Sequence, residues 1–172
     1  MMMLGLLMAL PLHVQSQTAY ERLIEKGMVH ASAGEYPDAI PIFKEAIRLN
    51  PDGVEGHYGL GYCYSLRCYE ENQDCEAAMQ EFTIAIHIDP SFRHSYFNRA
   101  VARTYLDDWE GALSDLNRQI HADDRKAMYF SRRAEVLYHL NRYEEACADI
   151  QVVRQLGGAY AHDWFDTLCP ER

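Results

Sequence analysis

Residues 95–120, SYFNRAVARTYLDDWEGALSDLNRQI, return in altered form as residues 128–153, MYFSRRAEVLYHLNRYEEACADIQVV. From Tyr96 onward the two stretches align without a gap at an offset of 34 residues. A fixed period of this length indicates an array in which each repeat is one supersecondary unit. The matched positions are Tyr96, Arg99, Ala100, Leu106, Trp109, Glu110, Ala112 and Asp115 in the first stretch and Phe130, Arg133, Ala134, Leu140, Tyr143, Glu144, Ala146 and Asp149 in the second.

The same pattern recurs twice upstream, so the chain contains four units. Small residues sit where two helices of a unit must approach closely, and one bulky apolar residue fills the space between them. Each unit therefore reads as two helices, with a proline or aspartate after the second helix of the first three units and Gly157 and Gly158 after that of the fourth. The corresponding positions are Gly27, Gly61, Ala100 and Ala134; Ala39, Ala78, Ala112 and Ala146; Phe43, Phe82, Leu116 and Ile150; and Pro51, Pro90 and Asp124.

The turns inside the units carry residues typical of helix ends. Gly34 marks the turn of the first unit. Asp107 with Glu110, and Asn141 with Glu144, have the spacing of a capping box, in which the first residue caps a helix and the acid three residues later caps in return. We therefore expect these pairs to begin the second helices of the third and fourth units.

A helix–turn–helix unit of this length and pattern resembles the tetratricopeptide repeat. The third unit departs from the family pattern, with Ala100 and Arg103 where Gly and Tyr are usual, but the helical spacing is intact. The resemblance is carried best by Gly27, Ala39, Phe43, Ala46 and Pro51 and by Leu60, Gly61, Tyr64, Ala78, Phe82, Ala85 and Pro90.

The resemblance implies an all-α fold, an α-solenoid of stacked antiparallel helix pairs with a right-handed superhelical path. It places a repeat domain at 17–172, with units at about 20–53, 54–92, 93–126 and 127–158. Residues 159–169 are expected to form a short helix that covers the exposed apolar face of the last unit, with Trp164 and Phe165 in a structural role.

Members of this family generally act as scaffolds that hold a peptide or partner segment in a groove lined by the first helix of each unit. The implied function here is a non-enzymatic adaptor, and the alternative is a structural protein that self-associates through the ends of the array. Several of the aromatic residues are also suited to packing against the neighbouring unit. The residues expected to line the groove are Met28, Tyr58, Tyr62, His94, Phe97, Asn98, Tyr105, Arg132, Tyr138 and His139.

One subfamily grips the C-terminal carboxylate of cytosolic chaperones with a clamp of Lys, Asn and Arg. Asn98 and Arg132 stand at matching positions, but Tyr58 and Met128 occupy the places of lysines. The resemblance therefore does not extend to this clamp, although Arg132 could still bind a carboxylate of a partner.

Charge and motifs narrow the function further. The net charge of −10 argues against nucleic acid, because binding phosphates requires a basic face. The sequence contains no glycine-rich phosphate loop, no G-x-S-x-G and no H-E-x-x-H motif, and its eight histidines are scattered. We expect no catalytic site, no cofactor and no metal site, and a protein or peptide as the partner.

The N-terminus begins with an apolar run from Met1 to Leu12, too short to cross a bilayer. Small residues at Val14 and Ser16 are compatible with cleavage of a signal peptide at 1–16, although no Lys or Arg precedes the run. The prediction is an exported protein, periplasmic or secreted, whose mature chain does not insert into a membrane. The alternative is a buried N-terminal helix in a cytoplasmic protein.

The second unit contains five extra residues in its turn, because Gly61 and Ala78 lie 17 apart where the other units have 12. Cys68 and Cys75 bracket this insertion, and we expect a disulfide between them that closes the enlarged turn. Cys63 is the rival partner. Cys147 is expected to be a buried apolar residue and Cys169 a free thiol near the C-terminus.

Overall fold

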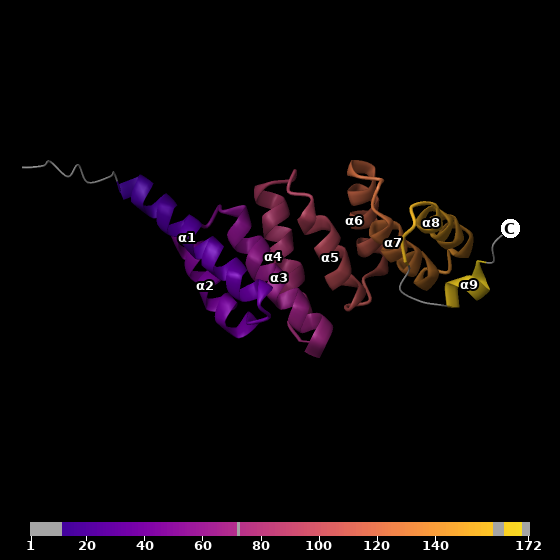
Figure 1. Ribbon diagram of the computed structural model, residues 1–172, viewed down its shortest axis with the longest axis horizontal. Helices are drawn as coiled ribbons and strands as arrows, with labels where there is room; N and C mark the ends of the chain where they lie inside the picture. Colours follow the sequence, from indigo (N-terminus) through magenta and orange to yellow (C-terminus); the bar gives the residue numbers. More distant parts are fainter. Residues whose placement is uncertain (1–11, 72, 160–163, 170–172) are drawn as a thin grey trace, which may run out of the picture.

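The computed structural model describes residues 12–71, 73–159 and 164–169, and all regular structure in them is helical. The helices follow one another along the long axis of the molecule, from α1 at one end to α9 at the other (Figure 1). They are α1 (Leu12–Ser32), α2 (Tyr36–Leu49), α3 (Val54–Glu71), α4 (Cys75–Ile88), α5 (His94–Thr104), α6 (Trp109–Ala122), α7 (Ala127–His139), α8 (Tyr143–Gln155) and α9 (Trp164–Leu168).

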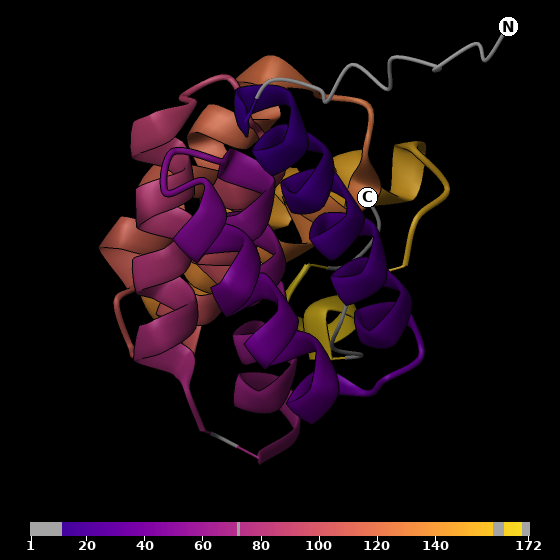
Figure 2. The same ribbon diagram turned by 90° about the vertical axis from the view of Figure 1, so that its left-hand side faces the viewer.

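The helices pack as four consecutive pairs, α1–α2, α3–α4, α5–α6 and α7–α8. Figure 2 looks along this array from the α1–α2 end. The first helices of successive pairs also contact each other, α1 with α3, α3 with α5 and α5 with α7. Within the described residues, the second helices of successive pairs make no such contact. The row formed by α1, α3, α5 and α7, hereafter the first-helix row, therefore lies on the inner side of the curved array.

The second helix of every pair begins at the same position of the repeat, at Tyr36, Cys75, Trp109 and Tyr143. The capping-box prediction for the third and fourth units is wrong. Asp107 and Asn141 adopt the left-handed conformation, with φ of 56° and 60°. They thus reverse the chain as Gly34 does at φ 79°, which Asp and Asn tolerate better than most residues.

The helix ends that follow these turns differ between the two units. Asp108, one residue later than predicted, caps α6 by accepting a hydrogen bond from the Gly111 N–H at 3.0 Å. The corresponding residue of α8, Arg142, makes no capping bond with its side chain. Asp107 and Asn141 therefore provide the left-handed backbone conformation of the turn, and neither residue caps the helix that follows.

Aromatic rings over glycines form the core of the first two pairs. The side chains of Phe43 and Phe82 are fully buried. A Cβ atom at Gly27 would lie 2.7 Å from the Phe43 ring, and one at Gly61 would lie 3.0 Å from the Phe82 ring. Gly59 faces the Phe43 ring more closely still. Gly27 and Gly59 are therefore required because a Cβ atom at either position would overlap the Phe43 ring, whereas a Cβ atom at Gly61 would make a tight contact with the Phe82 ring.

Smaller apolar residues and ion pairs hold the last two pairs together. Leu116 packs with Ala100 and Ala112 in one apolar cluster, which also includes Ala134, Ala146 and Ile150. In each pair an arginine of the first helix donates two hydrogen bonds to an aspartate of the second. Arg99 binds Asp115 at 2.8 and 2.7 Å, and Arg133 binds Asp149 at 2.7 and 2.7 Å.

The same arginines reach back to the preceding pair. Arg99 Nη1 donates to the Thr83 hydroxyl at 3.2 Å, and Arg133 Nη1 donates to Asn117 Oδ1 at 2.8 Å. Thr83 and Asn117 occupy equivalent positions on α4 and α6. Each arginine thus joins three helices, which ties the third pair to the second and the fourth to the third.

The structure contains two disulfides. Cys68 at the end of α3 is joined to Cys75 at the start of α4, with Cα atoms 4.8 Å apart, as expected for the enlarged turn. Cys147 is joined to Cys169, with Cα atoms 5.2 Å apart, so the predictions for these two residues are wrong. The reason is that α9 packs back against α8. Cys63 is the remaining thiol and is buried.

Helix α9 covers the end of the last pair, although it is described only over Trp164–Leu168 within the predicted 159–169. Phe165 is fully buried in the apolar cluster of the last two pairs, in the structural role expected for it, and the side chain of Trp164 is outside the described residues.

At the other end of the array, α1 begins at Leu12, so the predicted cleavage point after Ser16 falls inside this helix. Residues 1–11 lie outside the described residues. No helix in the described part of the chain has the length and apolar character needed to cross a membrane.

Candidate functional site

The residues predicted to line the groove lie on or beside the first-helix row, with different degrees of exposure. Met28, His94, Tyr105 and His139 are exposed. The others are partly buried: Tyr58, Tyr62, Phe97, Asn98, Arg132 and Tyr138.

Four of the predicted residues meet where α3 and α5 face each other. The Tyr58 ring lies 6.4 Å from the Tyr62 ring and 6.4 Å from the His94 ring. Asn98 donates to the Tyr58 hydroxyl at 3.2 Å. Phe92, which precedes α5, joins them 5.1 Å from Tyr58. Burial is the main cause that raises the pKa of Tyr58, so this phenol is held as a neutral hydrogen-bonding group.

A second group lies farther along the row, where α3, α5 and α7 approach each other. Tyr69 and Tyr105 meet edge to face at 6.4 Å, with 69% and 37% of their surfaces exposed. Arg132 is paired with Glu135 at 2.7 Å. Burial raises the pKa of Tyr105, the nearby Arg132 guanidinium lowers it, and Tyr69 and Glu135 raise it. This group offers exposed aromatic surface beside a charged pair.

The remaining predicted residues are engaged elsewhere. Phe97 packs against Tyr129 at 5.1 Å and joins the apolar clusters of the last two pairs. His139 stacks on Trp109 at 3.9 Å, at the side of the array where the pairs turn.

Tyr138 lies 5.4 Å from Tyr143, near the same turns. Met28 is exposed on α1. The structure therefore brings six of the ten predicted residues into two groups, Tyr58, Tyr62, His94 and Asn98 in one and Tyr105 and Arg132 in the other.

A cavity of about 390 Å³ opens at the start of the first-helix row, between α1, the α2–α3 turn and α3. Four carboxylates line it, and no lysine, arginine or histidine does. Ile24, Val54 and Tyr20 provide its apolar wall, and the carboxylates are those of Glu21, Glu25, Asp52 and Glu55. We call this cavity the acidic pocket. Glu21, Glu25 and Glu55 lie on first helices, whereas Asp52 belongs to the α2–α3 turn, and the repeat pattern alone did not bring the four carboxylates together.

Tyr20 organises one side of the acidic pocket. Its hydroxyl donates to Glu55 Oε2 at 3.0 Å and accepts from the Gly56 N–H at 3.1 Å. Burial is the main cause that raises the pKa of Tyr20 to about 12; the hydrogen bond from the Gly56 N–H lowers this pKa, and the nearby Glu55 carboxylate raises it. The phenol therefore stays protonated and holds Glu55 in place as a donor.

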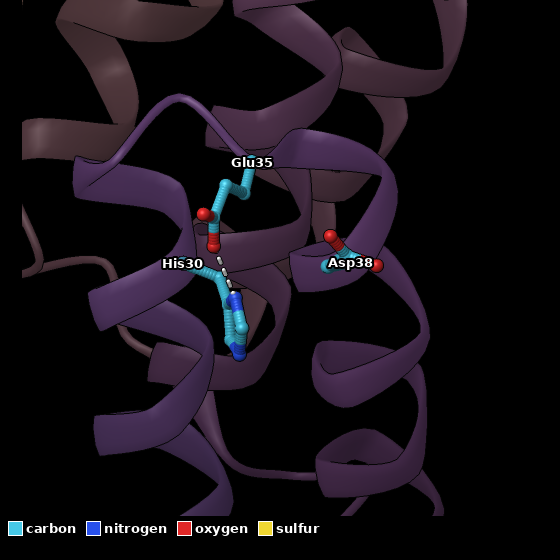
Figure 3. A group of neighbouring side chains, drawn as sticks. All are labelled: His30, Glu35 and Asp38. Atoms are coloured by element: carbon cyan, nitrogen blue, oxygen red, sulfur yellow. Dashed lines mark hydrogen bonds and ion pairs between the residues drawn. The ribbon is translucent and has the colours of Figure 1, made fainter.

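One group of possible metal ligands occurs among the described residues, His30, Glu35 and Asp38 at the α1–α2 turn (Figure 3). Their donor atoms lie within 4.8 Å of one another. His30 Nδ1 is already paired with Glu35 Oε2 at 2.7 Å, and both carboxylates are exposed. The group is explained as a polar contact across the turn, since the His–Glu pair joins the end of α1 to the residue before α2.

The comparisons with known proteins agree with this architecture. A model of the TPR repeat matches residues 27–66. A solved structure of the MamA RS-1 ArsTM double mutant superposes with a TM-score of 0.72 at 17% identity, covering 80% of this chain and 75% of that one. The chain folds as an array of tetratricopeptide repeats. This confirms the fold class that the repeat pattern predicted.

Other similar proteins bear on function. The DnaJ homolog subfamily C member 7 homolog of Dictyostelium discoideum is 25% identical over 147 residues, 79% of this chain and 27% of that protein. The first TPR of Spaghetti (RPAP3), solved bound to the HSP90 peptide SRMEEVD, has a TM-score of 0.65 and 18% identity, covering 72% of this chain and 97% of that one. This chain spans less than a third of the length of its first curated relatives.

Proposed function

We propose that this protein is a non-enzymatic adaptor that binds an extended segment of a partner protein along the first-helix row. The observation that carries the proposal is the pair of aromatic groups on that row, around Tyr58 and around Tyr105. Tyrosine offers large contact area with little loss of side-chain entropy and a polar tip, as interface hot spots require. A related fold that binds a peptide supports the same mode by analogy.

The Cys68–Cys75 and Cys147–Cys169 bridges support placing this adaptor in an oxidising compartment, where disulfides persist. Together with the apolar N-terminal run, they favour export. N-terminal sequencing of protein recovered from the periplasm or medium should begin at Gln17. Recovery of the chain with Met1 from the cytosol would contradict export.

The alternative, self-association through the ends of the array, has less support. Phe165 and Cys169 of the C-terminal segment cover the apolar face of the last pair, so that end does not offer a free surface for stacking. Sedimentation at micromolar concentration should therefore show a monomer. A concentration-dependent oligomer would favour the alternative.

The adaptor function can be tested with peptides selected from a random display library. A peptide enriched on the wild-type protein should bind about tenfold more weakly to His94→Ala and to Tyr105→Ala, because both side chains are exposed on the first-helix row. Ile84→Ala is the matched control, since Ile84 is 40% exposed on the second helix α4. Equal binding to all three variants, with unchanged circular dichroism, would exclude this row as the binding surface.

A further inference from the structure

The acidic pocket brings four carboxylates around one cavity with no lysine, arginine or histidine in its lining. Several carboxylates elsewhere in the molecule are paired with arginine or histidine, such as Glu45 with Arg48 and Glu81 with His57. Among the described residues, none of the four pocket carboxylates takes part in an ion pair. Within the described part of the chain, no ion pair neutralises the negative charge that the pocket concentrates.

Neutral donors hold two of these carboxylates in place. Tyr20 donates to Glu55 at 3.0 Å, and Gln17 donates to Glu21 at 3.2 Å. Tyr20 is itself fixed by the Gly56 N–H, and only 4% of its surface is exposed. The carboxylates are thus oriented without being neutralised, which is the arrangement expected of a preorganised site for a cation.

The walls of the pocket are suited to an alkyl chain. Ile24 and Val54 are partly buried and lie on the two helices that flank the opening. A lysine or arginine side chain can lie along such apolar surface while its charged end reaches polar groups. A metal ion would leave these apolar walls without a function, and an anionic group would be repelled.

We propose that the acidic pocket receives a lysine or arginine side chain of the bound partner segment. This inference rests on the proposed adaptor function, because the pocket opens at the start of the first-helix row. It adds a charge requirement: the segment carries a basic residue at the end that lies over α1 and α3. A guanidinium or ammonium group there makes charge-assisted hydrogen bonds to the carboxylates.

A pair of synthetic peptides tests the charge requirement. The probe is a fluorescein-labelled peptide of alternating leucine and arginine, and its partner contains citrulline in place of arginine, which keeps the shape and removes the charge. Fluorescence anisotropy should show the arginine peptide binding about tenfold more tightly, with the difference shrinking as salt is added. Equal binding of the two peptides, or no binding of the arginine peptide, overturns the inference.

Charge variants separate the pocket from the general negative charge of the protein. Glu21→Gln combined with Glu25→Gln should weaken binding of the arginine peptide about tenfold and leave the citrulline peptide unaffected. The control, Glu76→Gln combined with Glu144→Gln, removes the same charge from exposed positions on α4 and α8. If the control weakens binding equally, the attraction is unspecific and the pocket is not the site.

The two proposals fail in different ways. If peptides selected from the library lose affinity in His94→Ala and Tyr105→Ala but bind the pocket variants as well as the wild type, the adaptor function stands and the basic-residue site is wrong. If the selected peptides ignore the first-helix row altogether, the adaptor proposal fails as well.

Discussion

In α1–α4 the rings of Phe43 and Phe82 fill the space over glycines, whereas in α5–α8 Leu116 and Ile150 pack among alanines and an Arg–Asp pair joins the helices of each pair. Both halves build the same helix pairs on the same repeat. The difference shows that the repeat constrains the volume between the two helices and not the chemistry that fills it.

The second pair combines a phenylalanine ring over a glycine, as in the first pair, with an ionic contact between its helices, as in the later pairs. Glu81 on α4 is equivalent to Asp115 on α6 and Asp149 on α8. Each of the three follows the recurring alanine of its helix by three residues. Glu81 contacts His57 of α3 at 2.7 Å, whereas Asp115 and Asp149 contact arginines. The ionic contact between the helices is therefore sensitive to pH in the second pair, whereas the later pairs use arginine, which stays charged.

The largest effect is expected from removing an aromatic ring of the first half. Phe43→Ala should lower the free energy of unfolding by about 3–5 kcal/mol, because the fully buried ring leaves a cavity between α1, α2 and α3. Urea denaturation followed by circular dichroism measures this change. A loss below about 1 kcal/mol would contradict a core that depends on the ring.

Gly59→Ala tests how closely α3 packs on the Phe43 ring, because the added Cβ atom would overlap that ring. The substitution should lower the free energy of unfolding more in the wild type than in the Phe43→Leu variant, because the smaller leucine leaves room for a methyl group. Additive losses would show that the glycine is needed for another reason.

The second half should depend on its ion pairs instead. Asp115→Ala should lower the free energy of unfolding by about 3 kcal/mol, because it leaves the guanidinium groups of Arg99 and Arg103 without their shared carboxylate in a largely buried site. Glu145→Ala breaks the exposed pair with Arg142 and should change stability little. Similar urea midpoints for the two variants would show that the buried network adds no stability.

The two disulfides extend the comparison to covalent links. Removing Cys147–Cys169 should cost about 3.4 kcal/mol and removing Cys68–Cys75 about 2.5 kcal/mol, because the bridge with the larger sequence separation, 22 against 7, constrains the unfolded chain more. Paired Cys→Ser variants in urea denaturation measure both. A larger loss from the Cys68–Cys75 variant would show that the enlarged turn, and not chain entropy, determines the effect.

The repeat spacing was sufficient to predict the helix pairs and the bridge across the enlarged turn. Cys68 and Cys75 flank an insertion inside a known turn, so their proximity followed from the register. Cys147 and Cys169 could not be paired in this way, because Cys169 lies beyond the last repeat, where no periodicity fixes the path of the chain. Asp107 and Asn141 were misassigned because capping and left-handed turn positions favour the same residue types.

The candidate site was only partly predictable for a similar reason. Tyr58 and Phe97 were predicted to line a groove, but Tyr58 contacts His94 of the third pair and Phe97 contacts Tyr129 of the fourth. Helical periodicity does not separate a position that lines a groove from one that packs against the next pair. The acidic pocket combines α1, α3 and the α2–α3 turn. Such a combination depends on how successive pairs are rotated against each other, and that angle is not encoded in the spacing of one repeat.

The smallest effect is expected from pH, and it should arise in the second pair. His57 Nδ1 contacts Glu81 at 2.7 Å and Nε2 contacts the Pro51 carbonyl at 3.0 Å, so both ring nitrogens face acceptors and the doubly protonated ring satisfies both. The hydrogen bond to Glu81 is the main cause that raises the pKa of His57, against the effect of burial. Because the folded pKa is raised, this contact stabilises the fold fully below the unfolded value of about 6.5 and loses its effect as pH rises through the folded value.

The urea midpoint of the wild type should therefore fall as the pH rises from about 6.5 through the raised pKa of His57 in the folded state. The measurement is made against Glu81→Gln, which keeps an acceptor for His57 but removes the charge that favours the protonated ring. This variant should show a smaller fall over the same range. An identical fall in both proteins would assign the pH dependence to other groups. The ionic contact of the second pair would then be no more sensitive to pH than the arginine pairs of the third and fourth pairs.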